Sequence, residues 1–167
     1  MEFFCYHRDR VGSTALRGAM VEEHWSYMDR FAASLVARGP TFEGDVLTGS
    51  VHVVELPDAA AAREFAFDEP CWQAGAYRDV LVRRTQWQRP GGTATVGFLG
   101  IGLADPAPYD GLPVPRPGLV GFGPLLSDDG RLLLGAAVLA ATESAARDAL
   151  TRFPAVEVHQ WERGGRR

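Results

Sequence analysis

The sequence predicts an α+β fold built from two repeats of a βαββαβ unit, the first intact and the second shortened. A Gly-Pro pair recurs at Gly39-Pro40 and Gly123-Pro124, each time followed by an acidic turn, a glycine and a β-rich run. Each half then ends on a Gln-Trp pair after an apolar strand, at Trp87 and Trp161. The halves differ in length, because 48 positions separate Gly39 from Trp87 and only 38 separate Gly123 from Trp161.

The first half opens with the signals of a strand and a long helix. Residues 2–7 are rich in aromatic side chains and precede a charged, glycine-containing turn, which predicts a strand. From residue 15 to about residue 37, apolar side chains recur at helical spacing. Thr14 is a suitable N-cap for this helix, and Gly39-Pro40 is expected to end it.

Two more strands, a second helix and a last strand follow. The turn Glu43-Gly44-Asp45 divides residues 40–56 into a strand pair, Asp58 caps a helix over residues 59–65, and residues 77–87 form the final strand. This order is that of a ferredoxin-like unit, in which two helices cover one face of a four-stranded antiparallel sheet. Two such sheets packed face to face would make a barrel, within one chain or between two chains of a homodimer.

The second half is expected to be a degenerate copy without a site of its own. Its first strand is predicted over residues 94–103, but residues 105–117 contain five prolines where the first half has its long helix, so that helix is lost or replaced by a loop. The shortening falls where the first copy has Phe67 to Trp72. The predicted organisation is an active repeat over 1–88, a linker over 89–93, a degenerate repeat over 94–163 and a solvated basic tail over 164–167.

Composition narrows the functional classes. The 17 Lys and Arg residues are scattered against 21 Asp and Glu residues, so no nucleic-acid partner is expected. No apolar run approaches the roughly 20 residues of a membrane span. Cys5 and Cys71 match neither a disulfide framework nor a metal-ligand spacing, which favours a soluble protein of the reducing cytoplasm. Phosphate loops, nucleophile elbows and Cys/His clusters are missing from the sequence, so we expect neither a metal nor a cofactor.

His24 is the first candidate for chemistry. It lies four positions after Met20 and four before Met28, on the apolar stripe of the first helix, and should therefore face the sheet. One interpretation is a core histidine satisfied by a backbone carbonyl. The other is a general base, because an imidazole titrates near neutral pH.

Asp68 is the candidate partner of this histidine. It stands among apolar side chains just before Glu69-Pro70, where an ionised carboxylate is costly unless it is paired. A carboxylate bonded to one imidazole nitrogen would fix the tautomer and raise the basicity of the other nitrogen. The alternative is that Asp68 only caps the turn before Pro70.

A second set of side chains is predicted to contact a small, flat organic ligand, although ordinary core packing would also explain its aromatic members. His52 lies in the middle of a strand and either lines the space between the sheets or points outward. His7 and His159 are expected to have no function. The predicted ligand-contacting residues are Tyr6, Tyr27, His52, Glu69 and Trp72.

The pattern over about residues 1–88 resembles the YCII-related family. The resemblance is carried by four motifs in order: Glu23-His24-Trp25-Ser26-Tyr27, Arg38-Gly39-Pro40, Gly49-Ser50 and Phe67-Asp68-Glu69-Pro70. It implies a dimeric α+β barrel whose active-site pair is a histidine on the first helix and the aspartate of an Asp-Pro step. These residues correspond to His24 and Asp68, but Glu69 is inserted before the proline, so either acid fits the carboxylate position.

The resemblance also implies an activity. It suggests a lyase or isomerase that transfers protons on a cyclic or aromatic metabolite without metal or cofactor. The alternative is a non-catalytic protein of the same fold that binds a small molecule or acts as an accessory subunit.

Overall fold

The computed structural model describes residues 1–90, 94–111 and 117–166. It confirms the α+β class, with eight strands and five helices in the part of the chain that is described. The chain divides into two compact units, one formed by Met1–Val82 with the chain end from Gly164, the other by Arg83–Arg163. The division falls within a strand, and residues 91–93 of the predicted linker lie outside the described residues. No described helix has the length and apolarity that crossing a membrane requires.

The sheet of the first unit has the strand order β4-β1-β3-β2. The pairs β1–β3 and β2–β3 are antiparallel. A backbone bond of 2.9 Å from the Arg10 N–H to the Ala76 carbonyl links the end of β1 to the start of β4. The strands are β1 (Glu2–Asp9), β2 (Leu35–Glu43), β3 (Val46–Glu55) and β4 (Tyr77–Thr85), of which the part up to Val82 belongs to this unit.

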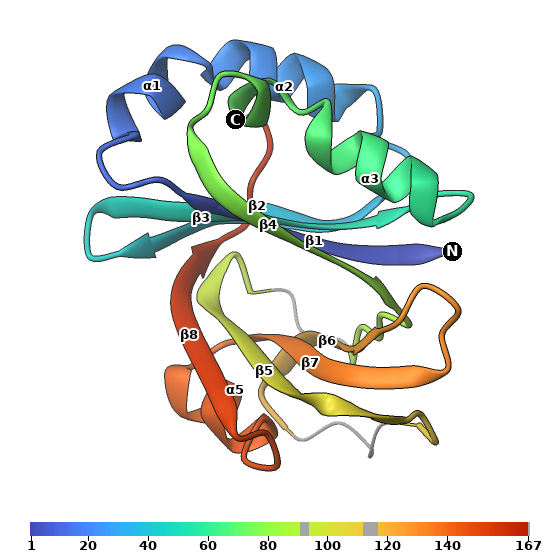
Figure 1. Ribbon diagram of the computed structural model, residues 1–167. Helices are drawn as coiled ribbons and strands as arrows, with labels where there is room; N and C mark the ends of the chain where they lie inside the picture. The colour runs from blue at the N-terminus through green and yellow to red at the C-terminus, as the bar shows by residue number, and fades with distance from the viewer. Residues whose placement is uncertain (91–93, 112–116, 167) are drawn as a thin grey trace. The chain divides into compact units, whose positions relative to one another are not determined.

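Helices cover one face of this sheet, as predicted (Figure 1). They are α1 (Thr14–Ala19), α2 (Val21–Asp29), α3 (Ala59–Phe67) and the short α4 (Pro70–Gln73). Asp58 caps α3 as expected, because its side chain accepts a 2.9 Å hydrogen bond from the Ala61 N–H. The predicted strand turn is also confirmed: β2 ends at Glu43, Gly44 has a φ of 60°, and β3 begins at Val46. The core between helices and sheet includes Phe3, Cys5, Tyr27, Met28, Val54 and Phe65.

The prediction of one helix over residues 15–37 is wrong. Two short helices meet at Met20, and the chain turns after α2 so that Leu35 already begins strand β2. Gly39-Pro40 therefore lies inside a strand and ends no helix. Thr14 is the first helical residue, and Ser13 takes the N-cap position without a side-chain bond. The apolar period of the sequence continued through the turn because both the helix and the following strand bury apolar side chains.

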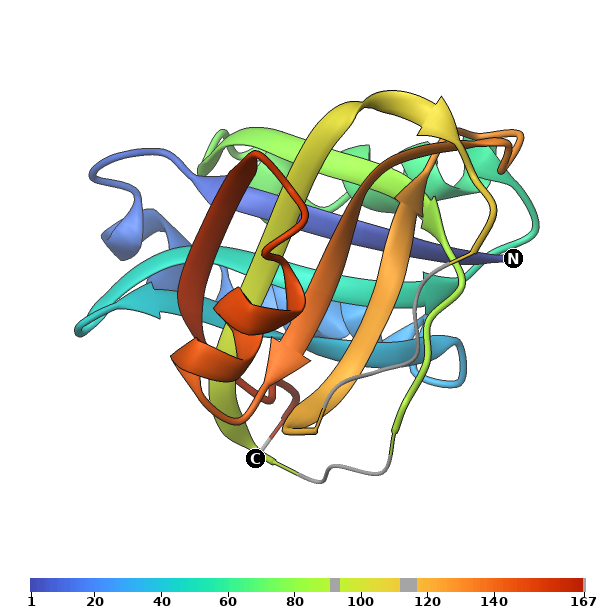
Figure 2. The same cartoon turned by 90° about the horizontal axis from the view of Figure 1, so that it is seen from below.

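The second unit has the sheet order β8-β5-β7-β6, with α5 lying on this sheet (Figure 2). If the four strands of each unit are numbered in chain order, both sheets have the order 4-1-3-2. Among its described residues no helix stands between β5 and β6, and β5 continues to Pro108. Whether the two units arose by duplication stays a prediction. The elements are β5 (Val96–Pro108), β6 (Leu119–Leu126), β7 (Leu132–Ala140), α5 (Glu143–Ala149) and β8 (Ala155–Glu162).

The described part of the predicted basic tail, residues 164–166, belongs to the first unit, and Arg166 is exposed there. It lies against α2 of the first unit (Figure 1). Arg166 donates hydrogen bonds of 2.7 Å to both Asp29 and Glu22, and its guanidinium stands 5.6 Å from the centre of the Trp25 ring. Ser26 accepts a further bond of 3.2 Å. One arginine thus bonds to three side chains on the exposed side of the helix.

Candidate functional site

Helix α2 holds His24 over the sheet. The backbone N–H of His24 bonds to the Met20 carbonyl at 2.9 Å, and its ring centre lies 5.8 Å from that of His52 on β3. This confirms the prediction that the residue faces the sheet. Its side chain is 13% exposed, so it is not fully buried.

Glu69 is turned inward by the sequence around it. The proline that follows disfavours a helical backbone at Glu69, which adopts φ −62° and ψ 128° and becomes the N-cap of α4. Its Oε2 atom accepts a 2.8 Å hydrogen bond from the Trp72 N–H. The side chain is completely buried, at 0% exposure. The carboxylate therefore has one oxygen fixed by the helix that it starts and one oxygen left for another partner.

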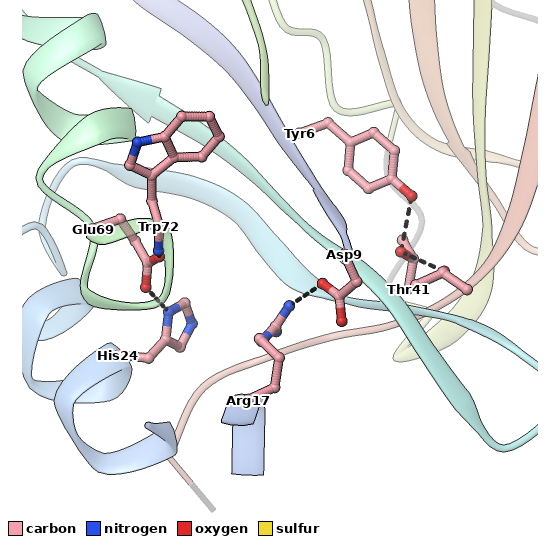
Figure 3. Close-up of polar contacts among 8 residues, drawn as sticks. Tyr6, Asp9, Arg17, His24, Thr41, Glu69 and Trp72 are labelled. Carbon is pink, nitrogen blue, oxygen red and sulfur yellow. Dashed lines mark hydrogen bonds and ion pairs between the residues drawn. The ribbon is translucent and has the colours of Figure 1, made fainter. Parts of the chain in front are cut away.

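That partner is His24. Its Nδ1 atom lies 2.7 Å from Oε1 of Glu69 (Figure 3). The expected pairing with Asp68 is thereby corrected, because Asp68 is exposed and forms the C-cap of α3, with its N–H bonded to the Glu64 carbonyl at 2.9 Å. Asp68 still belongs to the α3 backbone, whereas Glu69 lies beyond the helix end with an extended backbone, so the two side chains diverge.

The electrostatics of the pair fix its protonation. Burial raises the pKa of the Glu69 carboxyl, but the hydrogen bond and charge of His24, together with the Trp72 N–H, outweigh it and hold the pKa below its usual value. Glu69 is therefore an anion that only accepts hydrogen bonds. It follows that Nδ1 of His24 is the donor to Glu69, which leaves Nε2 as the ring nitrogen that can exchange a proton with another molecule. No described residue bonds to Nε2.

A buried ion pair lies beside His24 and Glu69, which together are called the dyad. Arg17 of α1 bonds to Asp9 at the end of β1 at 2.5 Å, and both side chains are nearly inaccessible (Figure 3). The guanidinium also stands 4.8 Å from the centre of the Tyr77 ring. Burial raises the pKa of Asp9 in spite of Arg17. The positive charge of Arg17 is thus partly balanced by a carboxylate outside the dyad.

Two further histidines are buried under the helices, and one of them was not expected to matter. His7 of β1 shares a strand face with Cys5, and its Nε2 donates a 2.8 Å bond to the Ala66 carbonyl. Burial lowers the pKa of His7 to about 4, so the ring is neutral. His52 was expected in the space between sheets or on an outer face, but its ring contacts His24 and Phe65 under the helices. Alternation along β1 was the signal that would have placed His7 here.

The other residues that were predicted to contact a ligand do not lie together in the structure. Tyr27 belongs to the core, where its hydroxyl donates to the Phe65 carbonyl at 3.1 Å. The Trp72 ring lies 6.2 Å from that of His7, near the dyad. Tyr6 alternates with His7 on β1 and points to the other face of the sheet, where its hydroxyl bonds to Thr41 at 3.0 Å (Figure 3). Among these three, only Trp72 is brought to His24 and Glu69.

One group of side chains has the residue types of a metal site. The ligand atoms of His24, Glu69 and Cys71 lie within 4.8 Å of one another. A metal would have to replace the proton between His24 and Glu69 and remove that of the Cys71 thiol, whose pKa burial raises to about 12. The donor set therefore suits a proton-transfer pair better than a metal. The expectation of no metal stays a prediction.

Several solved structures resemble the chain, and three of them show the range of similarity. The 5-chloro-2-hydroxyhydroquinone dehydrochlorinase from Burkholderia phenoliruptrix AC1100, solved with 2,5-dihydroxybenzoquinone, is 26% identical over 53% of this chain and 95% of its own, with a TM-score of 0.48. A monooxygenase-like protein from Lactobacillus acidophilus NCFM is 8% identical over 97% of this chain and 93% of its own, with a TM-score of 0.49.

The third is a monooxygenase-like protein from Fusobacterium nucleatum subsp. nucleatum ATCC 25586, 7% identical over 97% of this chain and 91% of its own. Its TM-score of 0.50 supports the fold and nothing further.

No curated protein matches the chain. The model of the YCII-related domain matches residues 1–87, which include both members of the dyad. Since this is more than half of the sequence, the chain belongs to the YCII-related family.

Proposed function

We propose that this protein is a small-molecule enzyme in which His24 is the general base and Glu69 orients it. The observation that carries the proposal is the 2.7 Å bond between His24 Nδ1 and the completely buried Glu69 carboxylate. A buried anion that already caps a helix holds the ring in one tautomer and stabilises the imidazolium that forms when Nε2 takes a proton. The side chain of His24 is 13% exposed, which is consistent with access of a substrate to the ring.

The reaction that such a base supports is the removal of a proton from carbon or oxygen. The proton then returns to another atom of the substrate, which is an isomerisation, or a leaving group departs, which is an elimination. Neither outcome requires a change of oxidation state. A cyclic or aromatic metabolite is the proposed substrate, and 5-chloro-2-hydroxyhydroquinone is the first compound to test.

The experiment compares two neighbouring acids. Glu69→Gln removes the negative charge next to His24 but keeps the side-chain length. Asp68→Asn makes the same replacement of a carboxylate by an amide, but at the exposed C-cap of α3. With wild-type protein and a panel of chlorinated hydroquinones and ring lactones, turnover is followed by chloride release and by deuterium uptake from D₂O. We expect kcat to fall about 10²-fold or more for His24→Gln and Glu69→Gln, and less than about twofold for Asp68→Asn.

Two results would contradict the proposal. Equal losses in both acid variants would show that Glu69 has no special role. Wild-type protein that binds members of the panel without converting any of them would favour a binding protein of this fold. Thermal unfolding of each variant separates a lost function from a lost fold.

A further inference from the structure

His52 has an unusual environment for a buried histidine. It lies in the middle of β3 and is 1% exposed. Its Nδ1 atom has no hydrogen-bond partner, and no described residue bonds to the other ring nitrogen. Buried polar atoms in native proteins nearly always have partners, so an imidazole with none requires a reason. A bound molecule that supplies the missing hydrogen bond is one such reason.

The neighbours of His52 place it at the proposed site. Its ring centre is 5.8 Å from that of His24, 6.2 Å from that of His7 and 5.8 Å from that of Phe65. Burial is the main cause that holds the pKa of His52 well below its usual value, and the neighbouring groups His24, His7, Arg17 and Arg38 act in the same direction. The ring is therefore neutral and keeps one N–H donor and one acceptor nitrogen.

We propose that His52 is a second catalytic residue, which donates a hydrogen bond to a substrate carbonyl oxygen while His24 takes a proton from the adjacent carbon. The inference rests on the proposed function and narrows its substrate class to enolisable ring carbonyl compounds. A neutral imidazole is suited to this role because it stabilises a developing enolate without giving up its own proton. His24 cannot play both parts, since its Nδ1 proton is engaged by Glu69.

The step balances within the site. The substrate C–H bond breaks, its proton passes to Nε2 of His24, and the electron pair moves through the new C=C bond onto the oxygen. His52 hydrogen-bonds the enolate oxygen. In an isomerisation of an unsaturated ring carbonyl compound, the enolate is conjugated with a second C=C bond, and His24 returns the proton to the far carbon of that system. In an elimination, the enolate reforms the carbonyl, an anionic leaving group departs from the neighbouring carbon, and His24 releases the proton to solvent.

The test uses the full chain with His52→Phe, which keeps a flat ring and removes both nitrogens, and with His52→Gln, which restores an N–H donor. Because the native ring has no hydrogen bond to a described residue, His52→Phe should melt at or above the wild-type temperature. Turnover of ring carbonyl compounds should nevertheless fall about 10²-fold in kcat. His52→Gln should recover at least about tenfold of that loss, and binding of 2,5-dihydroxybenzoquinone, followed by its absorbance, should weaken in His52→Phe.

The outcomes separate this inference from the proposed function. If His24→Gln is inactive while His52→Phe retains turnover within twofold, the base is supported and the role of His52 is overturned. If His24→Gln changes nothing but His52→Phe loses quinone binding, His52 contacts the ligand and the base assignment fails. If His52→Phe and His52→Gln both melt much lower than wild type, His52 is a structural residue. Wild-type protein that neither binds the quinone nor converts any compound overturns both.

Discussion

Gly49 and Gly135 occupy the same position in the two units. Each is the fourth residue of its strand, and each pairs with the residue after the proline of a Gly-Pro step, Thr41 in one unit and Leu125 in the other. A Cβ atom on Gly49 would lie 2.4 Å from the His7 carbonyl oxygen, and one on Gly135 would lie 2.2 Å from that of Gly102. The two hairpins therefore share one register and one close backbone approach.

This relationship predicts that neither glycine tolerates a side chain. Gly49→Ala and Gly135→Ala should each lower the free energy of unfolding by about 1–3 kcal/mol, because backbone atoms of the adjacent strand would have to move. Gly18→Ala is the matched control, since nothing lies within 4 Å of its added Cβ in helix α1. That variant should be neutral or more stable, by up to about 1 kcal/mol. Urea unfolding measures all three, and equal effects would contradict the explanation.

The strands and turns of the first unit could be predicted because their signals are local. Aromatic residues at positions 2–7, the turn at Gly44 and the cap at Asp58 each determine structure within a few residues. The end of the first helix could not be predicted in this way. Leu35 fits the apolar period of the helix, but it lies in a strand because it pairs with Val54 of β3, which is a long-range contact.

The site was predictable only in part, for the same reason. Helical spacing placed His24 over the sheet, and the motif limited its partner to Asp68 or Glu69. The choice between these acids depended on a helix too short to show any period, α4, whose N-cap is Glu69. The environment of His52 depends on which sheet face the helices cover at that strand, and that is decided by tertiary packing.

His7 gives the protein a defined dependence on pH. Its pKa is lowered by burial to about 4, whereas a histidine in the unfolded chain titrates near 6.5. Between these values the unfolded chain binds a proton that the folded protein excludes, so stability falls as the pH falls through this window. The depressed pKa corresponds to about 3 kcal/mol between pH 7 and pH 4, taking about 1.4 kcal/mol for each pH unit.

Variants isolate this contribution. Chemical unfolding of His7→Gln between pH 4 and pH 8 should show a shallower loss of stability than wild type, so the two curves approach each other in acid. Cys5→Ala removes a neighbour on the same strand face that does not titrate in this range, since burial raises the pKa of Cys5 to about 12. The free energy of unfolding of Cys5→Ala should therefore change with pH by the same amount as that of wild type. A His7→Gln curve that also runs parallel would show that His7 does not carry the effect.

Arg166 is expected to stabilise α2, the helix that carries His24. Its guanidinium bonds to Glu22 and Asp29, which stand at the two ends of α2, so Arg166→Ala should speed hydrogen exchange of the α2 amides. These ion pairs are exposed, and salt screens exposed charges. The difference from wild type should therefore be largest at low ionic strength and shrink in about 1 M salt. Arg163→Ala, three residues earlier, controls for the loss of a terminal charge, and equal exchange in both variants would mean that the contacts of Arg166 do not hold α2 in place.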